Sequence, residues 1–400
     1  MQRVSGGLIR LIGFALDYYL LNFCIGRAGG IIVNYPRFIL TFSLIFLLIC
    51  CGEKESEYPV TIETVDGVQV VTNPDFPRDG TTAFEMIEEI SIGGDVEDED
   101  YVFHKPYDVK VAGDGKILVL DWGDSTIKIY DDDGQYIRTI GGRGQGPGEF
   151  EGLVFFSIGS DGNVYVQDSM NHRVAVLDEQ GEYIAGFRIE DGLPYEFATD
   201  RKNFIYSGIQ FQDDEVRRLR ILRFNAAGEE ITDYGLFQLV QPVITKRTQN
   251  TVSSTMSRHA ATTVWTVDQE GKLYAGYGDK YQISVFDPEG NLFLKFGREF
   301  TPVENKLAGK PGQPDRIGVF NVINRRWLFD ESNNIWVEMF IKDDPEEIVY
   351  DVFSPEGIYL RQIKVKHRIS QIFRGKAYGF VRDEVGFVSV KRFKLVEMTK

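Results

Sequence analysis

Cysteine is almost absent from this 400-residue chain, and its placement is as informative as its scarcity. The three cysteines are Cys24, Cys50 and Cys51, so residues 52–400 contain none. Disulfide bonds are therefore excluded from the body of the protein. With 43% hydrophobic and 26% charged residues, the chain can fold around a large core without them.

Several kinds of functional chemistry also lack their usual residues. The four histidines, His104, His172, His259 and His367, are far apart and have no His-x-His or cysteine partner, so a transition-metal site is not expected. No Gly-x-Ser-x-Gly nucleophile motif is present, and no catalytic residue is predicted. The net charge of −16 disfavours binding to nucleic acid.

What the chain does contain is a repeat. Residues 114–137 and residues 161–184 share one order of features: Asp-Gly, a short β-rich run, a polar turn, a second run and a turn glycine. The turn glycines are Gly134, Gly181, Gly228, Gly290 and Gly357, at successive spacings of 47, 47, 62 and 67 residues. A period of about 40–50 residues indicates propeller blades, because one four-stranded sheet cannot bury its own faces.

Six blades are expected. Five copies carry a polar residue at the end of the third strand: Asp131, Asp178, Asn225, Asp287 and Ser354. A sixth, degenerate copy covers residues 368–393 and lacks an outer strand. The β-rich run at residues 85–92 can supply it by pairing with residues 386–395, which removes an open sheet edge. The sequence therefore predicts an all-β, six-bladed β-propeller closed by an N-terminal strand.

This organisation divides the chain into three segments. We expect a leader at residues 1–51, a spacer with a β-hairpin around Asp66-Gly67 at residues 52–83, and the propeller at residues 84–400. The uncharged apolar run at residues 38–50 has the length of a signal-peptide core rather than a membrane span. That signal is complete without residues 1–33, so we expect the true start to lie downstream of them.

The end of the leader resembles a bacterial lipoprotein signal. Its apolar run ends in two cysteines followed by the polar stretch Gly52 to Ser56. The residue before a lipidated cysteine is usually small, so Ile49 argues against Cys50 and favours Cys51 as the lipidated residue. The resemblance implies export and a durable lipid anchor in the cell envelope. The alternative is an uncleaved signal anchor.

A second resemblance concerns the ring itself. Residues 138–150, Arg-Thr-Ile-Gly-Gly-Arg-Gly-Gln-Gly-Pro-Gly-Glu-Phe, resemble the connector between blades of NHL-repeat proteins, and residues 168–174 resemble the Asn-His-Leu signature, with Arg173 in the Leu position. The likeness is strongest over residues 106–187. Together with the leader, it resembles the six-bladed propeller lipoproteins of Bacteroidota-type bacteria. It implies the fold and an address at the outer membrane of a Gram-negative bacterium, but no chemistry.

Candidate ligand-binding residues lie in the turns between the second and third strands of the blades. They are Trp122, Asp124, Asn171, His172, Arg173, Tyr277, Asp279 and Lys280. Equivalent turns converge on one face of a propeller, so we expect a binding rim around the axial channel. The structural alternative is that Asp and Asn satisfy their own turns while Arg pairs with a repeat Asp.

The favoured function is a binding or scaffolding module for a protein, peptide or glycan. One alternative is a calcium-dependent hydrolase or lyase of the gluconolactonase and paraoxonase type, with Asp, Asn and Glu around an axial calcium ion, although spacing alone does not assemble that set. Another is a structural envelope protein assembled through its rim. Basic insertions at residues 238–261 and 298–324 would cover the channel, receive an anionic partner or lie at the rim.

Overall fold

The computed structural model describes residues 58–94, 97–189, 192–213, 216–239, 243–247, 252–255, 261–301, 327–339 and 346–398. The predicted leader, with Cys50 and Cys51, half of the first insertion and most of the second lie outside these residues. The chain divides into two compact units, residues 1–57 and 58–400, and the described residues all belong to the second. Among them, no helix is long and apolar enough to cross a membrane.

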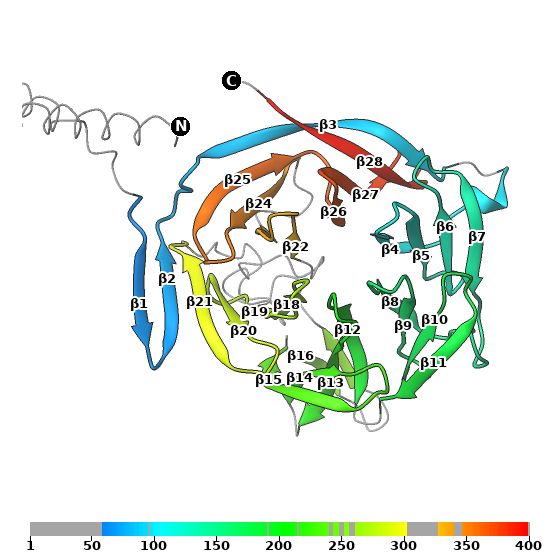
Figure 1. Cartoon of the computed structure of the whole chain (residues 1–400), viewed down its shortest axis with the longest axis horizontal. Coiled ribbons are helices and arrows are strands. Elements are labelled where there is room, and N and C mark those ends of the chain that lie inside the picture. Colours follow the sequence, from blue (N-terminus) through cyan, green and yellow to red (C-terminus); the bar gives the residue numbers. More distant parts are fainter. Residues whose placement is uncertain are drawn as a thin grey trace, which may run out of the picture. The chain divides into compact units, whose positions relative to one another are not determined.

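Six blades surround a central axis, and the first strand of each blade lies innermost (Figure 1). The first blade contains β4 (Pro106–Val111), β5 (Ile117–Asp121), β6 (Thr126–Tyr130) and β7 (Tyr136–Gly141). The second contains β8 (Leu153–Ile158), β9 (Val164–Asp168), β10 (Arg173–Leu177) and β11 (Tyr183–Arg188). The third contains β12 (Leu193–Thr199), β13 (Ile205–Asp213), β14 (Val216–Phe224) and β15 (Glu230–Gln238).

The remaining blades follow the same antiparallel order. The fourth contains β18 (Thr263–Val267), β19 (Leu273–Tyr277), β20 (Gln282–Phe286) and β21 (Leu292–Arg298). The fifth contains β22 (Leu328–Phe329), β23 (Ile335–Glu338), β24 (Ile348–Phe353) and β25 (Tyr359–Val365). The sixth contains β26 (Gln371–Phe373), β27 (Lys376–Arg382), β28 (Val388–Glu397) and β3 (Thr81–Ile92). Outside this order are β1 (Thr61–Val65), β2 (Val68–Asn73), the pair β16 (Val243–Arg247) and β17 (Val252–Thr255), and the short 3-10 helix η1 (Glu99–Tyr101).

The ring closes through both ends of the described unit. The outer strand of the sixth blade is β3, which pairs antiparallel with β28 from Ile92 opposite Val390 to Phe84 opposite Glu397. This is the pairing predicted for residues 85–92. It covers the edge of β28, which would otherwise be the open outer edge of the sixth blade.

The N-terminal segment also binds two further blades. The predicted hairpin is present as β1 and β2, and β2 pairs in parallel with β21 at the outer edge of the fourth blade. The buried amide of Asn73 donates hydrogen bonds to the carbonyls of Gly297 and Gly357, both at 2.8 Å, and accepts one from the backbone N–H of Tyr359 at 2.9 Å. Residues 81–83 then pair with β25 of the fifth blade. One segment thus stabilises three consecutive blades.

The repeated polar residue at the end of the third strand closes the turn that follows it. Asp131 accepts hydrogen bonds from the backbone N–H groups of Asp133 and Gln135 at 3.0 and 2.8 Å. The same pair of bonds recurs at Asp178, Asn225, Asp287 and, through its hydroxyl, Ser354. A tight turn leaves backbone N–H groups without partners. These side chains supply acceptors for them, so the strand reverses at this position.

The turn glycines have a second role that spacing does not reveal. All five have a positive φ, and each faces the outer strand of the preceding blade. A Cβ atom at Gly134 would lie 2.8 Å from Ile90, and one at Gly357 would lie 2.5 Å from Phe296. Gly181, Gly228 and Gly290 face Ile140, Phe187 and Thr232 in the same way. Glycine is therefore required both by the backbone conformation and by the close approach of neighbouring blades.

A further repeated contact joins the second strand to the turn before it. The hydroxyl groups of Tyr165, Tyr206 and Tyr274 donate to the carboxylates of Asp161, Asp200 and Asp268, and the indole N–H of Trp336 donates to Asp330. Burial is the largest cause that raises the pKa of each of these three tyrosines well above the ordinary value of 10, and the charge of the neighbouring aspartate adds to it. The aromatic side chain thus fills the space between blades while its polar end stays bonded.

Candidate functional site

The inner strands surround an axial cavity of about 910 Å³. Its lining runs from the first residues of β4 and β12, Pro106 and Leu193, to the last residues of β12 and β18, Thr199 and Val267. The aromatic residues of the lining are Tyr107, Phe155, Phe197, Trp265, Trp327 and Phe380. Its charged residues are Lys110, Glu196, Glu338, Arg368 and Arg382. A cavity of this volume, mostly apolar with a few charged groups, has the size and chemistry of a ligand site.

The inner strands of the fifth and sixth blades are short. β22 has two residues and β26 has three, whereas β12 has seven. Side chains of the second strands also line the cavity, from Glu338 at the end of β23 and Arg382 at the end of β27. The sixth blade, which was predicted as degenerate, has four strands and a short first strand.

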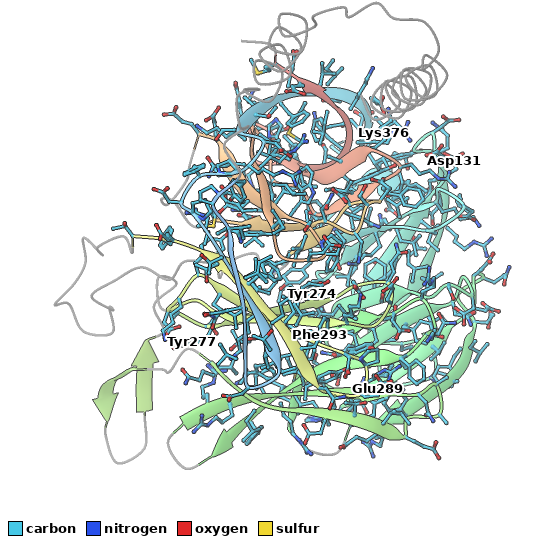
Figure 2. All side chains as sticks on the ribbon, turned by 60° about the vertical axis from the view of Figure 1, so that its left-hand side comes forward. Asp131, Tyr274, Tyr277, Glu289, Phe293 and Lys376 are labelled. Atoms are coloured by element: carbon cyan, nitrogen blue, oxygen red, sulfur yellow. The ribbon has the colours of Figure 1, made fainter. Side chains whose placement is uncertain are left out.

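The ring has two distinct faces. We call cavity face the one at which first strands begin and second strands end, and Asp-Gly face the opposite one, which carries the turns of the Asp-Gly repeat. Figure 2 shows Tyr277, at the end of a second strand, on the opposite side of the ring from Asp131 and Glu289, which lie in turns after third strands. The turns predicted as a binding rim therefore all belong to the cavity face.

A bidentate ion pair belongs to the lining of the cavity. The Nε atom of Arg368 contacts both carboxylate oxygens of Glu338, at 2.8 and 3.0 Å, and the Glu338 side chain is buried. Tyr350 packs behind this pair. Burial, with the Glu338 charge as the second cause, raises the pKa of Tyr350 well above its ordinary value. Glu338 thus already has a cationic partner, Arg368.

Exposed apolar surface is present on the other side of the cavity. Tyr107 and Phe155, from the inner strands of the first two blades, pack edge to face with ring centroids 6.0 Å apart. Tyr107 is 50% exposed and Leu193 is 40% exposed. Trp265 and Trp327 also border the cavity but are only 4% and 3% exposed, so both act mainly as packing residues. The accessible rings of the cavity are therefore Tyr and Phe.

The turn of the second blade is occupied by structural contacts. Arg173 donates to the carboxylate of Asp168 at 3.2 Å and to the carbonyls of Gln145, Gly146 and Glu149. Asn171 donates to the same carboxylate at 2.6 Å and to the carbonyl of Gly144 at 3.2 Å. These contacts fasten the Gly-rich connector between β7 and β8, as the structural alternative described. His172, at a positive φ of 49°, places Nδ1 3.2 Å from the carbonyl of Gly192.

The turn of the first blade is more open. Trp122 is 45% exposed, and the ammonium group of Lys105 lies 4.8 Å from its ring centroid. Asp124 contacts Nδ1 of the exposed His104 at 2.7 Å. In the fourth blade, Asp279 and Lys280 are exposed in a turn closed by a hydrogen bond from the Lys280 N–H to the Tyr277 carbonyl, at 3.4 Å. Burial raises the pKa of Tyr277.

None of the eight predicted residues is among those that line the axial cavity. The physical reason is the position of their turns. Each joins the second strand to the third, and neighbouring strands are about 5 Å apart, so these turns lie one to two strand spacings outside the inner strand. The eight residues therefore lie farther from the axis than the side chains that line the cavity, and the binding rim stays a prediction. Sequence reasoning missed Tyr107, Phe155 and Arg382, which carry no motif.

Two groups of described residues bear on the calcium alternative. Calcium takes six to eight oxygen ligands. The carboxylates in the described lining of the cavity are Glu196 and Glu338, and Glu338 is paired with Arg368. His104, Asp121 and Asp124 form a cluster elsewhere, with candidate ligand atoms within 4.8 Å of one another. However, Asp121 already accepts three backbone hydrogen bonds, from His104, Lys105 and Gly123. A calorimetric calcium titration is the direct test of the enzyme alternative.

Comparison with known proteins supports the architecture. The DUF5128 family model, described as a 6-bladed beta-propeller, matches residues 96–273. No curated protein matches the sequence. The chain is similar to solved structures at low sequence identity. A Bacteroides fragilis protein described as exported is 10% identical over 82% of this chain and 98% of its own, with a TM-score of 0.49.

Two further structures are similar to a comparable share of the chain. A member of the DUF4221 family from Bacteroides vulgatus is 13% identical over 79% of this chain and 99% of its own, with a TM-score of 0.47. Virginiamycin B lyase from Staphylococcus aureus is 13% identical over 79% of this chain and 86% of its own, with a TM-score of 0.40. With the matching family model and the observed ring, the chain is a six-bladed β-propeller.

Proposed function

We propose that this protein is a binding module that holds a peptide segment of a partner protein in its axial cavity and on the surrounding cavity face. The observation that carries the proposal is the distribution of exposed apolar side chains in the turns and strand ends of the ring. Six large ones belong to the cavity face: Tyr107, Trp122, Met170, Leu193, Val385 and Phe387. On the Asp-Gly face, exposed large hydrophobic residues lie near the starts of outer strands, at Ile137, Tyr183, Ile231 and Phe293. The turns of that face have none among the described residues, whereas Trp122, Met170, Val385 and Phe387 lie in turns of the cavity face. Exposed apolar surface concentrated around a cavity is typical of an interaction site.

The composition of the cavity favours a peptide over a glycan. Aromatic rings, aliphatic side chains and charges of both signs line it, which matches the mixed chemistry of a polypeptide segment. Both tryptophans of the lining are buried, so a sugar platform would have to depend on Tyr107, whose ring already packs against Phe155. The same proposal includes the cellular address. A lipid at Cys51, or at Cys50, would anchor the exported ring to the outer membrane and present it to partners in the envelope.

Selection from a random peptide library, followed by calorimetry with the purified protein, tests this function. The informative variant is Tyr107→Ala with Leu193→Ala, which removes exposed side chains from the mouth of the cavity. The matched control is Tyr183→Ala with Ile184→Ala, on the exposed outer strand β11. We expect the first pair to weaken binding of a selected peptide at least tenfold and the control pair to leave it unchanged.

Two results would contradict the proposal. One is a failure to select any peptide, and the other is an equal effect of the two variants, which would place binding outside the cavity face. A glycan array with the same proteins decides the other ligand class. Glycan binding that depends on Tyr107 and Leu193, without peptide binding, would assign the cavity to a sugar.

A further inference from the structure

Arg382 differs from the other arginine that lines the cavity. Arg368 is neutralised by Glu338 through the bidentate contact already described. Arg382 instead donates from Nη1 to the carbonyl of Gly386 at 2.6 Å, within its own turn. In the described part of the chain, no carboxylate forms an ion pair with it, and its side chain is exposed. Nε and Nη2 therefore still face solvent and can meet a ligand.

The surroundings of Arg382 strengthen an interaction with an anion. Phe380 precedes it by two residues on β27 and therefore points to the same side of the sheet, and both residues line the cavity. Val388, opposite Arg382 in the register of β27 and β28, completes this apolar wall. A charge beside apolar surface is less screened than one in open water, so a carboxylate at this position would be held more strongly.

The local charge also contrasts with that of the whole protein. The cavity has three basic side chains, Lys110, Arg368 and Arg382, against the two acidic ones, Glu196 and Glu338. The chain as a whole has a net charge of −16. An acidic ligand would be repelled by most of this surface and would find its attraction within the cavity. We therefore expect an acidic ligand to bind in the cavity, in one orientation, rather than elsewhere on the surface.

We infer that the axial cavity recognises a carboxylate of its peptide ligand through Arg382, with an adjacent apolar side chain of the ligand on Phe380. This inference rests on the proposed function and specifies its ligand class. Arginine suits the role because its planar guanidinium presents two parallel N–H groups to a carboxylate. The carboxylate belongs either to the C-terminus of the peptide or to an acidic side chain.

Three phenylalanine-rich tetrapeptides, all acetylated at the N-terminus, test the inference by calorimetry. The first has a free C-terminal carboxylate, the second is its C-terminal amide, and the third is an amide with one aspartate. We expect the free acid, the aspartate peptide or both to bind at least tenfold more tightly than the neutral amide. Arg382→Gln should reduce that difference to less than twofold. Arg188→Gln, the same change on the exposed outer strand β11, should leave it intact.

The peptides separate the two sources of carboxylate. Preference for the free acid alone assigns the chain terminus, and preference for the aspartate peptide assigns the side chain. Equal binding of all three, or a preference that persists in Arg382→Gln, would overturn the inference and leave the proposed function intact. Absence of binding by all three overturns the inference, and together with an empty library selection it overturns the proposed function. Thermal unfolding of both variants verifies that each remains folded.

Discussion

The two faces of this ring use their turns in opposite ways. On the Asp-Gly face, aspartate side chains close the turns, glycines contact the preceding blade and tyrosine hydroxyls bind the aspartates. On the cavity face, large apolar side chains such as Val385 and Phe387 are exposed, and Arg382 has no carboxylate partner among the described residues. The difference indicates that one face is committed to holding the blades together, which leaves the other face available for a ligand.

Structural turns and exposed turns also occur side by side on the cavity face. Arg173 and Asn171 lie on the cavity face, yet their polar groups are engaged with the connector between the first two blades. Trp122 occupies the corresponding turn of the first blade and is 45% exposed. A conspicuous polar motif can therefore be structural, while a nearby exposed aromatic residue offers surface to a partner.

The largest expected effect is alkaline destabilisation through the Asp-Gly face. Burial raises the pKa of Tyr165, Tyr206 and Tyr274 above the unfolded value near 10. Their contribution is therefore complete below pH 10 and is lost as pH rises toward the folded-state pKa. The free energy of unfolding should fall by about 1.4 kcal/mol per pH unit for each such tyrosine above pH 10.

Urea denaturation between pH 8 and 11.5 measures this loss. Tyr206→Phe serves as the comparison, because it removes one ionisable hydroxyl while keeping the ring that packs between blades. Its stability should decline less steeply above pH 10 than that of the natural protein. A free energy of unfolding that is constant across this range would show that the buried tyrosines do not couple folding to pH.

The next largest effect concerns the turn glycines. Gly181→Ala should destabilise the ring by about 2–4 kcal/mol, because alanine would combine a positive φ with a clash against Ile140. Gly235→Ala is the matched control, since Gly235 has a similar φ of 87° but no atom within 4 Å of an added Cβ. The control should lose only about 1–2 kcal/mol in the same denaturation assay. Equal losses of stability in the two variants would mean that the contact of Gly181 with Ile140 does not limit the size of the residue at this position.

A smaller effect tests the turn of the second blade. Arg173→Ala should cost about 1–3 kcal/mol, because it leaves the fully buried Asp168 carboxylate with fewer partners and releases the connector. Lys280→Ala, in the exposed turn of the fourth blade, should change the free energy of unfolding by no more than about 0.5 kcal/mol. If Arg173→Ala is as mild as this control but weakens peptide binding, Arg173 belongs to the ligand site after all.

The smallest expected effect is that of Trp122→Ala. The ring is half-exposed and contacts the Lys105 ammonium, a cation–π interaction worth about 0.5–1 kcal/mol at exposed sites. Thermal unfolding should therefore shift by at most a few degrees. A loss of stability as large as that of Gly181→Ala would mean that the turn containing Trp122 is also structural, although its ring is exposed.

The sequence by itself determined the secondary structure, the number of blades and the strand that closes the ring. These features depend on local chemistry, because alternation sets the strands and Asp, Asn, Ser and Gly set the turns between them. The closing pair of β3 and β28 was predictable for a related reason. An unpaired β-rich run near the N-terminus matched a blade that lacked its outer strand.

Only the tertiary structure decided which residues reach the cavity. Arg382 is among the lining residues although it ends the second strand of its blade, whose first strand, β26, has three residues. Asn73 likewise bonds to residues 224–286 positions away, at a site that no local pattern marks. Such contacts depend on how the blades pack around the axis, which is why eight residues chosen from turn motifs lie outside the cavity and Arg382, which belongs to no motif, lies within it.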